Sequence, residues 1–418
     1  MEQNTQSSVK ESESFVSHLE GAIDGERLPA GTIYTTNKDR PIWVQYDIET
    51  IRETCSPQTF VGREASMWRY RELLPPAPDD EIISLGEGLS PLLPCPELSK
   101  TFGLTDVWVK DESQLPTGSF KSRGLAMAVT MAHKFGIKKV AIPTAGNAGG
   151  ALSAYAARAG MEAFVFMPAD TSVINQQECQ LSGARLYLVD GLINVCGAIV
   201  KAGKERVGWF DMSTLKEPYR IEGKKTMGLE LAEQFNWRLP DVILYPTGGG
   251  TGLIGMWKAF KELRELGWLT SETMPRMVSV QSDGCCPIVN AFKSGARFAE
   301  PVIDAKTIAS GIRVPGAVGD FMILDTLKES EGCAVAVAES GIRKWQELGA
   351  RKSGIAICPE TAACVGALEQ LAESGWIRKA DRVVVFNTGA AQKYPYDSAD
   401  KTKVLTGPDD MNWDQFKT

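Results

Sequence analysis

Histidine is nearly absent from this sequence: His18 and His133 are the only two in 418 residues, and neither lies in a motif. Serine–histidine hydrolases and histidine-rich metal sites need imidazole at defined positions, so both classes are disfavoured. No apolar run approaches the roughly 18 residues that span a bilayer, which argues against a membrane protein. The start, MEQNTQSSVKESES, is polar and partly acidic, so it does not resemble a secretory signal.

The nine cysteines form no CxxC pair, and Cys285 and Cys286 are simply adjacent. This pattern predicts reduced, mostly buried thiols in a cytoplasmic protein, with no metal site. The net charge is −7 and no basic run stands out, which disfavours a nucleic-acid partner. An anionic small molecule stays compatible with this charge, because local dipoles and a few cations can outweigh it.

Apolar segments alternate with helical stretches along most of the chain, which predicts an α/β fold with parallel sheets. Most of the segments are apolar throughout, as strands buried on both faces should be. Trp257, Phe260 and Leu263 repeat at three-residue steps, which predicts an amphipathic helix between two strands. The predicted strands suffice for two sheets and cover residues 107–110, 139–145, 162–168, 185–190, 241–247, 277–282, 354–360 and 382–389.

The two ends of the chain read differently from its middle. Residues 1–14 predict a disordered leader, and turn signals between residues 16 and 47 predict a small β-rich extension. The segment PPAPDD at 75–80 predicts a linker or rigid turn. The polar tail after about residue 398 predicts a loose end.

Lys121 follows a predicted strand and a polar turn, and it stands where a helix should begin. The positive end of a helix dipole favours a neutral lysine amine, which is the form that makes a Schiff base. A lone lysine here is more often an exposed residue of a capping turn. The other strand ends therefore have to decide the matter.

Residues 245–255, YPTGGGTGLIG, follow a strand and open a helix. Their glycines leave several backbone N–H groups free to converge on an anion. They also contain a GxGxxG pattern, but a dinucleotide site needs an acidic residue about 20 positions further on. Asp283 ends the next strand about 30 positions on, and no Walker lysine follows the glycines. A monophosphate ester is therefore the better ligand.

Two further strand ends are rich in polar residues. Residues 143–150 place backbone amides and the Asn147 side chain at a helix start, which suits a carboxylate or a ring hydroxyl. Thr388 ends the last predicted strand and offers a hydroxyl. A lysine, a phosphate cradle, a hydroxyl and an anion-binding turn are together the parts of a pyridoxal phosphate (PLP) site.

The sequence resembles the fold-type II PLP enzymes and, within them, the threonine synthases, over about residues 46–396. The segments that carry the resemblance are 67–75 (MWRYRELLP), 86–92 (GEGLSPL), 116–124 (PTGSFKSRG), 144–147 (TAGN), 219–226 (YRIEGKKT), 248–252 (GGGTG) and 387–389 (NTG). It implies a tryptophan-synthase-β-like fold of two lobes, each a mostly parallel sheet flanked by helices. The implied domains are an extension at 1–80, a large PLP-binding domain at 81–123 plus 220–400, a small domain at 124–219 and a tail at 401–418.

The resemblance also implies roles for individual residues. Lys121 would form the Schiff base and move protons, with Phe120 beside it, Asn147 on the ring hydroxyl and Thr388 on the pyridine nitrogen. The cofactor phosphate would lie on Gly248, Gly249, Gly250, Thr251 and Gly252. The substrate would contact Ser119, Thr144, Ala145 and Gly146, with Arg220 and Lys224 or Lys225 at its phosphate. Glu222 and Glu360 are candidates for a carboxylate that assists Lys121.

The resemblance implies a carbon–oxygen lyase that converts O-phosphohomoserine and water to threonine and phosphate. It also implies a homodimer. Rivals on the same scaffold are a cysteate synthase, which uses O-phosphoserine and sulfite, and a threonine or serine dehydratase. A silent ligand-binding protein and a dinucleotide-dependent oxidoreductase are the rivals of other classes. Two departures from the family are a cysteine-free stretch at 18–25, which predicts no zinc, and an unusual continuation at 389–394.

Overall fold

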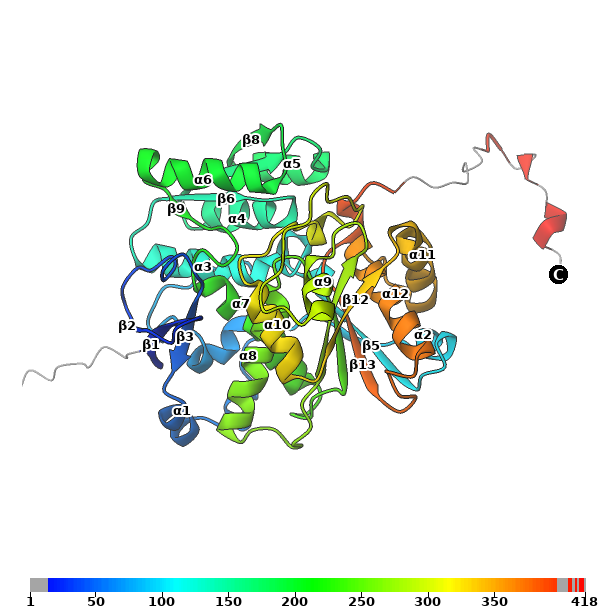
Figure 1. Cartoon of the computed structure of the whole chain (residues 1–418), viewed down its shortest axis with the longest axis horizontal. Helices are drawn as coiled ribbons and strands as arrows, with labels where there is room; N and C mark the ends of the chain where they lie inside the picture. Colours follow the sequence, from blue (N-terminus) through cyan, green and yellow to red (C-terminus); the bar gives the residue numbers. More distant parts are fainter. Residues whose placement is uncertain (1–13, 397–404, 408–409, 412, 417–418) are drawn as a thin grey trace, which may run out of the picture.

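The computed structural model describes residues 14–396, 405–407, 410–411 and 413–416 (Figure 1). The predicted disordered leader therefore lies outside the described residues except for Ser14, and most of the predicted loose tail does too. Two parallel sheets form the body of the molecule, and a small antiparallel sheet joins one side. The fold class predicted from the sequence is confirmed.

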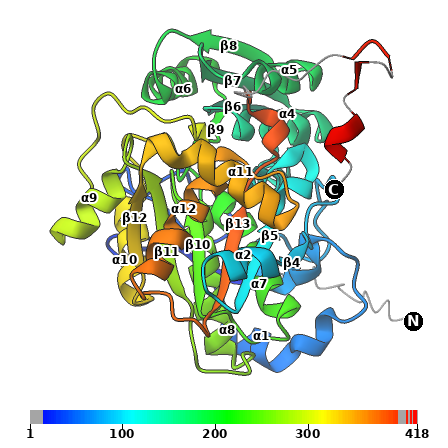
Figure 2. The same ribbon diagram turned by 90° about the vertical axis from the view of Figure 1, so that its right-hand side faces the viewer.

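The larger sheet has six strands, and all neighbouring pairs are parallel except β4 with β5. Every residue of β10 is buried, because helices cover both faces of the sheet. Figure 2 shows α2 (Pro96–Thr101), α11 (Ile342–Ser353) and α12 (Pro359–Glu373) on one face, with α7 (Tyr219–Gln234) and α8 (Thr251–Leu266) behind the sheet. In spatial order the strands are β12 (Cys333–Val337), β11 (Arg276–Ser282), β10 (Val242–Pro246), β13 (Arg382–Asn387), β5 (Asp106–Asp111) and β4 (Leu92–Pro94).

The smaller sheet has four parallel strands. Its strands in spatial order are β8 (Arg185–Val189), β7 (Glu162–Pro168), β6 (Lys139–Pro143) and β9 (Phe210–Asp211). Helices α4 (Asn147–Arg158), α5 (Val173–Leu181) and α6 (Ile193–Val207) connect and cover them (Figure 1).

The chain reaches the smaller sheet through α3 (Lys121–Lys134) and returns through α7 (Tyr219–Gln234). These two helices cross in close contact, because a Cβ on Gly223 would lie 2.1 Å from the carbonyl oxygen of Arg123. The remaining helices are α1 (Ile48–Thr54), α2 (Pro96–Thr101), α8 (Thr251–Leu266), α9 (Pro287–Ser294), α10 (Asp320–Glu329), α11 (Ile342–Ser353) and α12 (Pro359–Glu373).

The predicted β-rich extension is an antiparallel sheet of β2 (Arg27–Leu28), β1 (Val16–Gly21) and β3 (Ile42–Tyr46). Tyr46 anchors it: the hydroxyl donates to Glu222 at 2.7 Å. The ammonium groups of Lys225 and Lys258 lie 3.9 and 4.8 Å from the centre of its ring. The extension is thereby fixed to helices α7 and α8.

One strand prediction is wrong. Residues 354–360 form only an isolated bridge between Ile357 and Ala390, because Gly354 caps the end of α11 and Pro359 already begins α12. One edge of the large sheet is instead formed by β12, whose CAVAV run has no predicted counterpart. The other seven predicted strands are present, and the helix containing Trp257, Phe260 and Leu263 buries all three.

Seven of the nine cysteines are buried, in line with the prediction of mostly buried thiols. Within the described residues no group of histidine, cysteine, aspartate and glutamate side chains has the arrangement of a metal site. No helix in the described part of the chain is long and apolar enough to cross a bilayer.

Candidate active site

A cavity of about 700 Å³ lies where the carboxyl ends of the two sheets meet. Loops that follow β6, β10 and β13 all open into it, as parallel α/β sheets lead one to expect. Most of the predicted site residues line this one cavity: Phe120, Lys121, Thr144, Ala145, Gly146, Asn147, Arg220, Gly248, Gly249, Gly250, Thr251, Gly252 and Thr388.

Lys121 is the first residue of α3, as predicted, and its side chain reaches the cavity. The residue keeps some exposure on the cavity side, yet the protein around it desolvates the amine. Burial, helped by the nearby Arg220 charge and opposed by Glu360, lowers the pKa of Lys121 to about 7. The sequence predicted a neutral amine from the helix dipole, whereas burial is the main cause here. A large share of this amine is therefore unprotonated at neutral pH.

A buried ion network holds the start of α3 in place. Arg123 donates to Glu112 at 2.6 Å and to Glu230 at 2.7 Å, and all three side chains are fully buried. Lys110 reaches the same Glu230 at 3.0 Å. These two cations hold the pKa of Glu230 at about 2 although burial opposes ionisation. Lys121 thus begins a helix whose first turn is locked by paired charges.

The glycine loop before α8 has the geometry of a phosphate cradle. Gly250 caps the helix in a left-handed conformation (φ +76°), and no side chain caps the first-turn N–H groups. A Cβ on Gly252 would lie 2.0 Å from the Tyr245 hydroxyl, and one on Gly248 would lie 2.7 Å from the Gly311 carbonyl. Side chains are thereby excluded, and uncapped N–H groups at a helix start bind anions.

Thr388 and Asn147 face the cavity from different sheets. Thr388 follows β13, and its hydroxyl lies 3.7 Å from the Cys358 thiol. Asn147 begins α4, and its amide nitrogen donates to the Tyr394 hydroxyl at 3.0 Å. The hydroxyl and the amide therefore offer two polar contacts to a ring placed between them.

Several cavity side chains carry buried polar atoms without a hydrogen-bond partner within the described residues. Such atoms are rare in proteins, so their concentration here indicates a polar ligand. They suit PLP, which brings a phosphate, a ring hydroxyl and a ring nitrogen. The atoms are Asn147 Oδ1, Asn175 Oδ1, Arg220 Nε, Tyr245 Oη and Glu360 Oε2.

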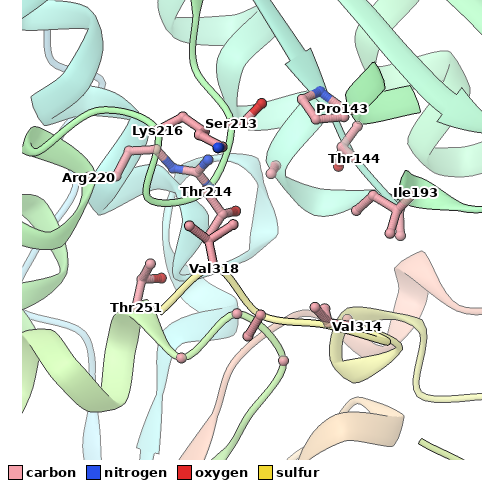
Figure 3. A pocket seen from close by; sticks show the side chains of 18 of the residues that line it. Pro143, Thr144, Ile193, Ser213, Thr214, Lys216, Arg220, Thr251, Val314 and Val318 are labelled. Atoms are coloured by element: carbon pink, nitrogen blue, oxygen red, sulfur yellow. The ribbon is translucent and has the colours of Figure 1, made fainter. Parts of the chain in front are cut away.

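Arg220 and Lys216 bring positive charge to one wall of the cavity (Figure 3). Arg220 is 2% exposed and donates to the Met212 carbonyl at 2.7 Å. Ser213 and Thr214 lie on the same segment and add hydroxyls. Pro143 and Thr144 lie at the end of β6 in the smaller sheet, the sheet whose strand β9 precedes Ser213 and Thr214. This wall places positive charge and hydroxyl groups in the cavity that also contains the glycine cradle.

Four predicted candidates lie outside the cavity lining. The Lys224 ammonium is fully buried and donates to the Phe120 carbonyl. Lys225 and Glu222 pair with each other at 2.8 Å beneath the N-terminal sheet. Ser119 is fully buried, and its hydroxyl has no hydrogen-bond partner within the described residues. Lys224, predicted at the substrate phosphate, thus does not line the cavity, whereas Lys216 does.

Lys216, Tyr245 and Tyr394 line the cavity, and sequence reasoning missed all three. Lys216 follows β9, a strand of two residues that is too short to recognise from its pattern. Its spacing of four residues from Arg220 is the signal that was available. Glu360, one of the two candidate carboxylates, does line the cavity.

The arrangement defines a class of α/β enzyme that holds an organic phosphate cofactor between two sheets. Residues 83–389 match the family model described as pyridoxal-phosphate dependent enzyme. Solved structures agree on the fold: maize serine racemase has a TM-score of 0.63 at 20% identity, covering 72% of this chain and 88% of that one. A threonine deaminase from tomato (Solanum lycopersicum) has a TM-score of 0.62 at 21% identity, covering 72% and 83%.

Curated relatives are closer in sequence. A threonine synthase of Methanocaldococcus jannaschii is 35% identical over 87% of this chain and 89% of its own length. One of Mycobacterium tuberculosis is 31% identical over 83% and 92%. This chain belongs to the pyridoxal-phosphate-dependent enzymes, in the family whose members are named threonine synthase. Its cofactor is pyridoxal 5′-phosphate.

Proposed function

We propose that this protein converts O-phosphohomoserine and water to threonine and phosphate. The observation that carries the proposal is the basic wall formed by Arg220 and Lys216, which lies in the same cavity as the glycine cradle. A cradle for the cofactor phosphate and a separate cationic wall suit a substrate that carries a phosphate of its own. The names of the curated relatives support the same reaction.

In this proposal the cofactor is held by residues from three strand ends. The N–H groups of residues 248–252 bind its phosphate, Asn147 meets the ring hydroxyl and Thr388 the ring nitrogen. Lys121 Nζ holds the cofactor covalently. The Phe120 ring packs beside this amine, and its centre lies 4.2 Å from Nζ. Bound PLP supplies an electron sink for negative charge that develops on the substrate carbons.

The chain's own residues orient the substrate and move protons. The amides at the start of α4 bind the substrate carboxylate, and Arg220 with Lys216 binds the phosphate. Lys121 Nζ takes the α-proton and later returns protons, a role that suits an amine with a pKa of about 7. Overall the Cγ–O bond breaks, phosphate leaves, Cγ gains a proton and the water oxygen becomes the Cβ hydroxyl.

The test is a comparison of substrates on the cofactor-loaded protein. Phosphate release is followed with O-phosphohomoserine, with O-phosphoserine plus and minus sulfite, and with unphosphorylated threonine and serine. We expect phosphate and threonine in equal amounts from O-phosphohomoserine alone. A Lys121→Ala variant, which removes the amine, should release none.

Other outcomes assign the site differently. Phosphate release from O-phosphoserine that depends on sulfite would replace the proposed substrate with that of a cysteate synthase. Ammonia release from threonine or serine, with no turnover of either phosphorylated compound, would make the enzyme a dehydratase. Lys121→Ala with unchanged turnover would remove Lys121 from the mechanism.

A further inference from the structure

The Thr388 hydroxyl, which the proposed function places at the ring nitrogen, has buried polar neighbours that do not line the cavity. These neighbours are Cys358, Thr361 and Asn387, and all three are fully buried. Hydrogen bonds join them to one another and to Thr388. The direction of each bond can be worked out in turn, because some of the groups can only donate and others can only accept.

Asp111, at the end of β5, fixes the first direction. Its Oδ1 accepts the Ser113 backbone N–H at 3.1 Å and the Asn387 Nδ2 at 2.8 Å. The nitrogen of the Asn387 amide therefore faces Asp111, and its oxygen faces the start of α12. There the amide oxygen accepts the Cys358 backbone N–H at 3.3 Å. Because a backbone N–H only donates, the orientation of this amide is fixed from both sides.

Thr361, the third residue of α12, has its hydroxyl proton directed away from Thr388. Its Oγ1 lies 2.9 Å from Asn387 Oδ1 and 3.3 Å from the Phe386 carbonyl oxygen, and neither oxygen can donate. The lone pairs of Oγ1 are therefore left to accept. They receive the Thr388 backbone N–H at 3.3 Å, and the Cys358 thiol lies 3.1 Å away.

The Cys358 thiol takes its direction from Thr361. Because the Thr361 proton points to an acceptor, the 3.1 Å contact has the S–H as its donor. Burial raises the pKa of this thiol to about 12, so the thiol keeps its proton at neutral pH. In the remaining contact, 3.7 Å between Cys358 Sγ and Thr388 Oγ1, the Thr388 hydroxyl is then the donor. Sulfur is a weak acceptor, so a better acceptor in the cavity can take this proton.

The backbone of Thr388 is held on both sides as well. Its N–H donates to Thr361 Oγ1, and its carbonyl accepts the Phe120 N–H at 3.1 Å. Phe120 immediately precedes Lys121, the first residue of α3. Thr388 thus connects the start of α12 with the lysine-bearing turn, and Thr361 is its partner on the α12 side.

We propose that Thr361 is a positioning residue for the cofactor and acts on it through Thr388. Thr361 holds the Thr388 backbone and takes the proton of the Cys358 thiol, so that the Thr388 hydroxyl meets the ring nitrogen in one orientation. No proton is transferred and no covalent bond changes. The inference rests on the proposed placement of Thr388 at the ring nitrogen, and it adds a residue that does not itself touch the cofactor.

The test measures PLP affinity by fluorescence titration of the cofactor-free protein, and the visible absorbance of the loaded protein. Hydrogen bonds to a ring nitrogen tune the electronics of a cofactor, so the absorbance reports on Thr388. Thr361→Val removes the hydroxyl and keeps the shape of the side chain. We expect it to weaken PLP binding roughly three- to tenfold, the worth of about one neutral hydrogen bond. It should also shift the absorbance in the same direction as Thr388→Val.

Two further variants separate positioning from a general loss of stability. Thr361→Ser keeps the hydroxyl and should bind PLP within about twofold of the wild type. In the double variant of Thr361→Val and Thr388→Val, the change at Thr361 should alter PLP affinity by less than about twofold, because the hydroxyl that it positions is already gone.

Thr130→Val is the matched control. Thr130 is a buried threonine of α3 whose hydroxyl also accepts a backbone N–H, that of Ile83 at 3.1 Å, and it does not line the cavity. This change should lower the stability of the cofactor-free protein in urea, as Thr361→Val does. It should leave PLP affinity and absorbance unchanged.

Several outcomes would overturn the inference. They are wild-type PLP affinity and absorbance in Thr361→Val, an equal loss of affinity in Thr130→Val, and single losses that simply add in the double variant. If Thr361→Val does not fold, Thr361→Cys replaces the hydroxyl with a weak acceptor, and wild-type binding by that variant would count against the inference. Wild-type binding by Thr388→Val would remove both the placement of Thr388 and the role of Thr361.

The substrate enters none of these measurements. A failure of O-phosphohomoserine turnover therefore counts against the proposed reaction alone. Unchanged PLP binding in the Thr361 variants counts against the positioning role alone.

Discussion

The Lys224 amine donates a hydrogen bond to the backbone carbonyl of Phe120, the residue immediately before Lys121. It lies 4.2 Å from the centre of the Phe120 ring, the same distance as the Lys121 ammonium. A Cβ on Gly124 would come within 2.9 Å of the Lys224 side chain, so only glycine leaves room for it. The cavity lysine therefore shares the Phe120 ring with a second lysine, which does not line the cavity.

This second lysine should destabilise the fold at neutral pH. Burial, together with the charges of Lys121 and Arg220, holds the pKa of Lys224 well below its usual value of 10.5. The unfolded chain then binds a proton that the folded chain refuses, so folding is penalised below pH 10.5. We expect Lys224→Met to raise the free energy of unfolding by about 1–2 kcal/mol at pH 7, after the lost hydrogen bond is counted, and by less at pH 10.

Urea unfolding at the two pH values measures this difference. Lys258→Met is the control with the opposite sign, because Glu222 and Glu262 raise the pKa of Lys258 and its loss leaves them short of a partner. That change should destabilise the protein at pH 7. If Lys224→Met raised the free energy of unfolding equally at both pH values, protonation of Lys224 would not be the cause of the destabilisation.

The Arg123 network should stabilise the protein in a pH-dependent way. Glu230 has a pKa of about 2 in the folded state, against 4.5 ordinarily, because Arg123 and Lys110 surround it. Its contribution is fully present above pH 4.5 and is lost as the pH falls toward 2. We expect Glu230→Gln to lower the free energy of unfolding by about 3 kcal/mol at pH 7, and the gap to the wild type to narrow in acid.

Denaturant unfolding from pH 7 down to pH 3 checks this prediction. Glu265→Gln alters an exposed residue at the end of α8 and should change the free energy of unfolding by less than about 0.5 kcal/mol throughout. A gap between Glu230→Gln and the wild type that stays constant over this range would contradict the assigned protonation.

The sequence predicts the fold well because each buried strand carries its own apolar run. It misplaces one edge of the large sheet, because the CAVAV run of β12 has small residues at three of its five positions. Residues 354–360 are apolar for another reason: Ile357 and Cys358 are buried just before α12 begins. Most of the cavity-lining residues are predictable because they follow strand ends. Lys216 is not predictable, because the preceding strand β9 has only two residues and gives no pattern. Lys224 is predicted to bind the substrate because the sequence does not show that its side chain is fully buried. The predicted domain limits, homodimer and cytoplasmic location stay predictions.

Glycine at position 252 should be indispensable to the cradle. An alanine Cβ there would overlap the Tyr245 hydroxyl at 2.0 Å, and Tyr245 is itself fully buried. We expect Gly252→Ala to weaken PLP binding at least about tenfold, measured by fluorescence titration of the cofactor-free protein. Gly197→Ala is the matched control on another cavity helix. Its Cβ meets nothing within 4 Å, so it should bind PLP normally and stabilise α6 by up to about 1 kcal/mol.

Arg220 and Lys216 should act on the phosphorylated substrate. Loss of a charged hydrogen bond to phosphate costs about 1.5–3 kcal/mol, which corresponds to roughly 10- to 150-fold in kcat/KM. We expect Arg220→Gln and Lys216→Met each to lower kcat/KM for O-phosphohomoserine by a factor within this range in steady-state assays. Lys201→Met removes an exposed cation of the same cavity and should have a smaller effect. A larger loss at Lys201 than at Arg220 would move the phosphate to the mouth of the cavity.

Helices α3 and α7 cross at the point where the segment that forms the smaller sheet leaves and rejoins the rest of the chain. The whole segment that builds the four-stranded sheet leaves and returns where Gly223 meets the Arg123 carbonyl. Lys121 and Arg220 each lie within about one helical turn of that point. A rotation of the four-stranded sheet about this crossing would therefore displace Lys121 and Arg220 little. The distance between the lysine and the guanidinium would then stay nearly constant whatever angle the sheet takes.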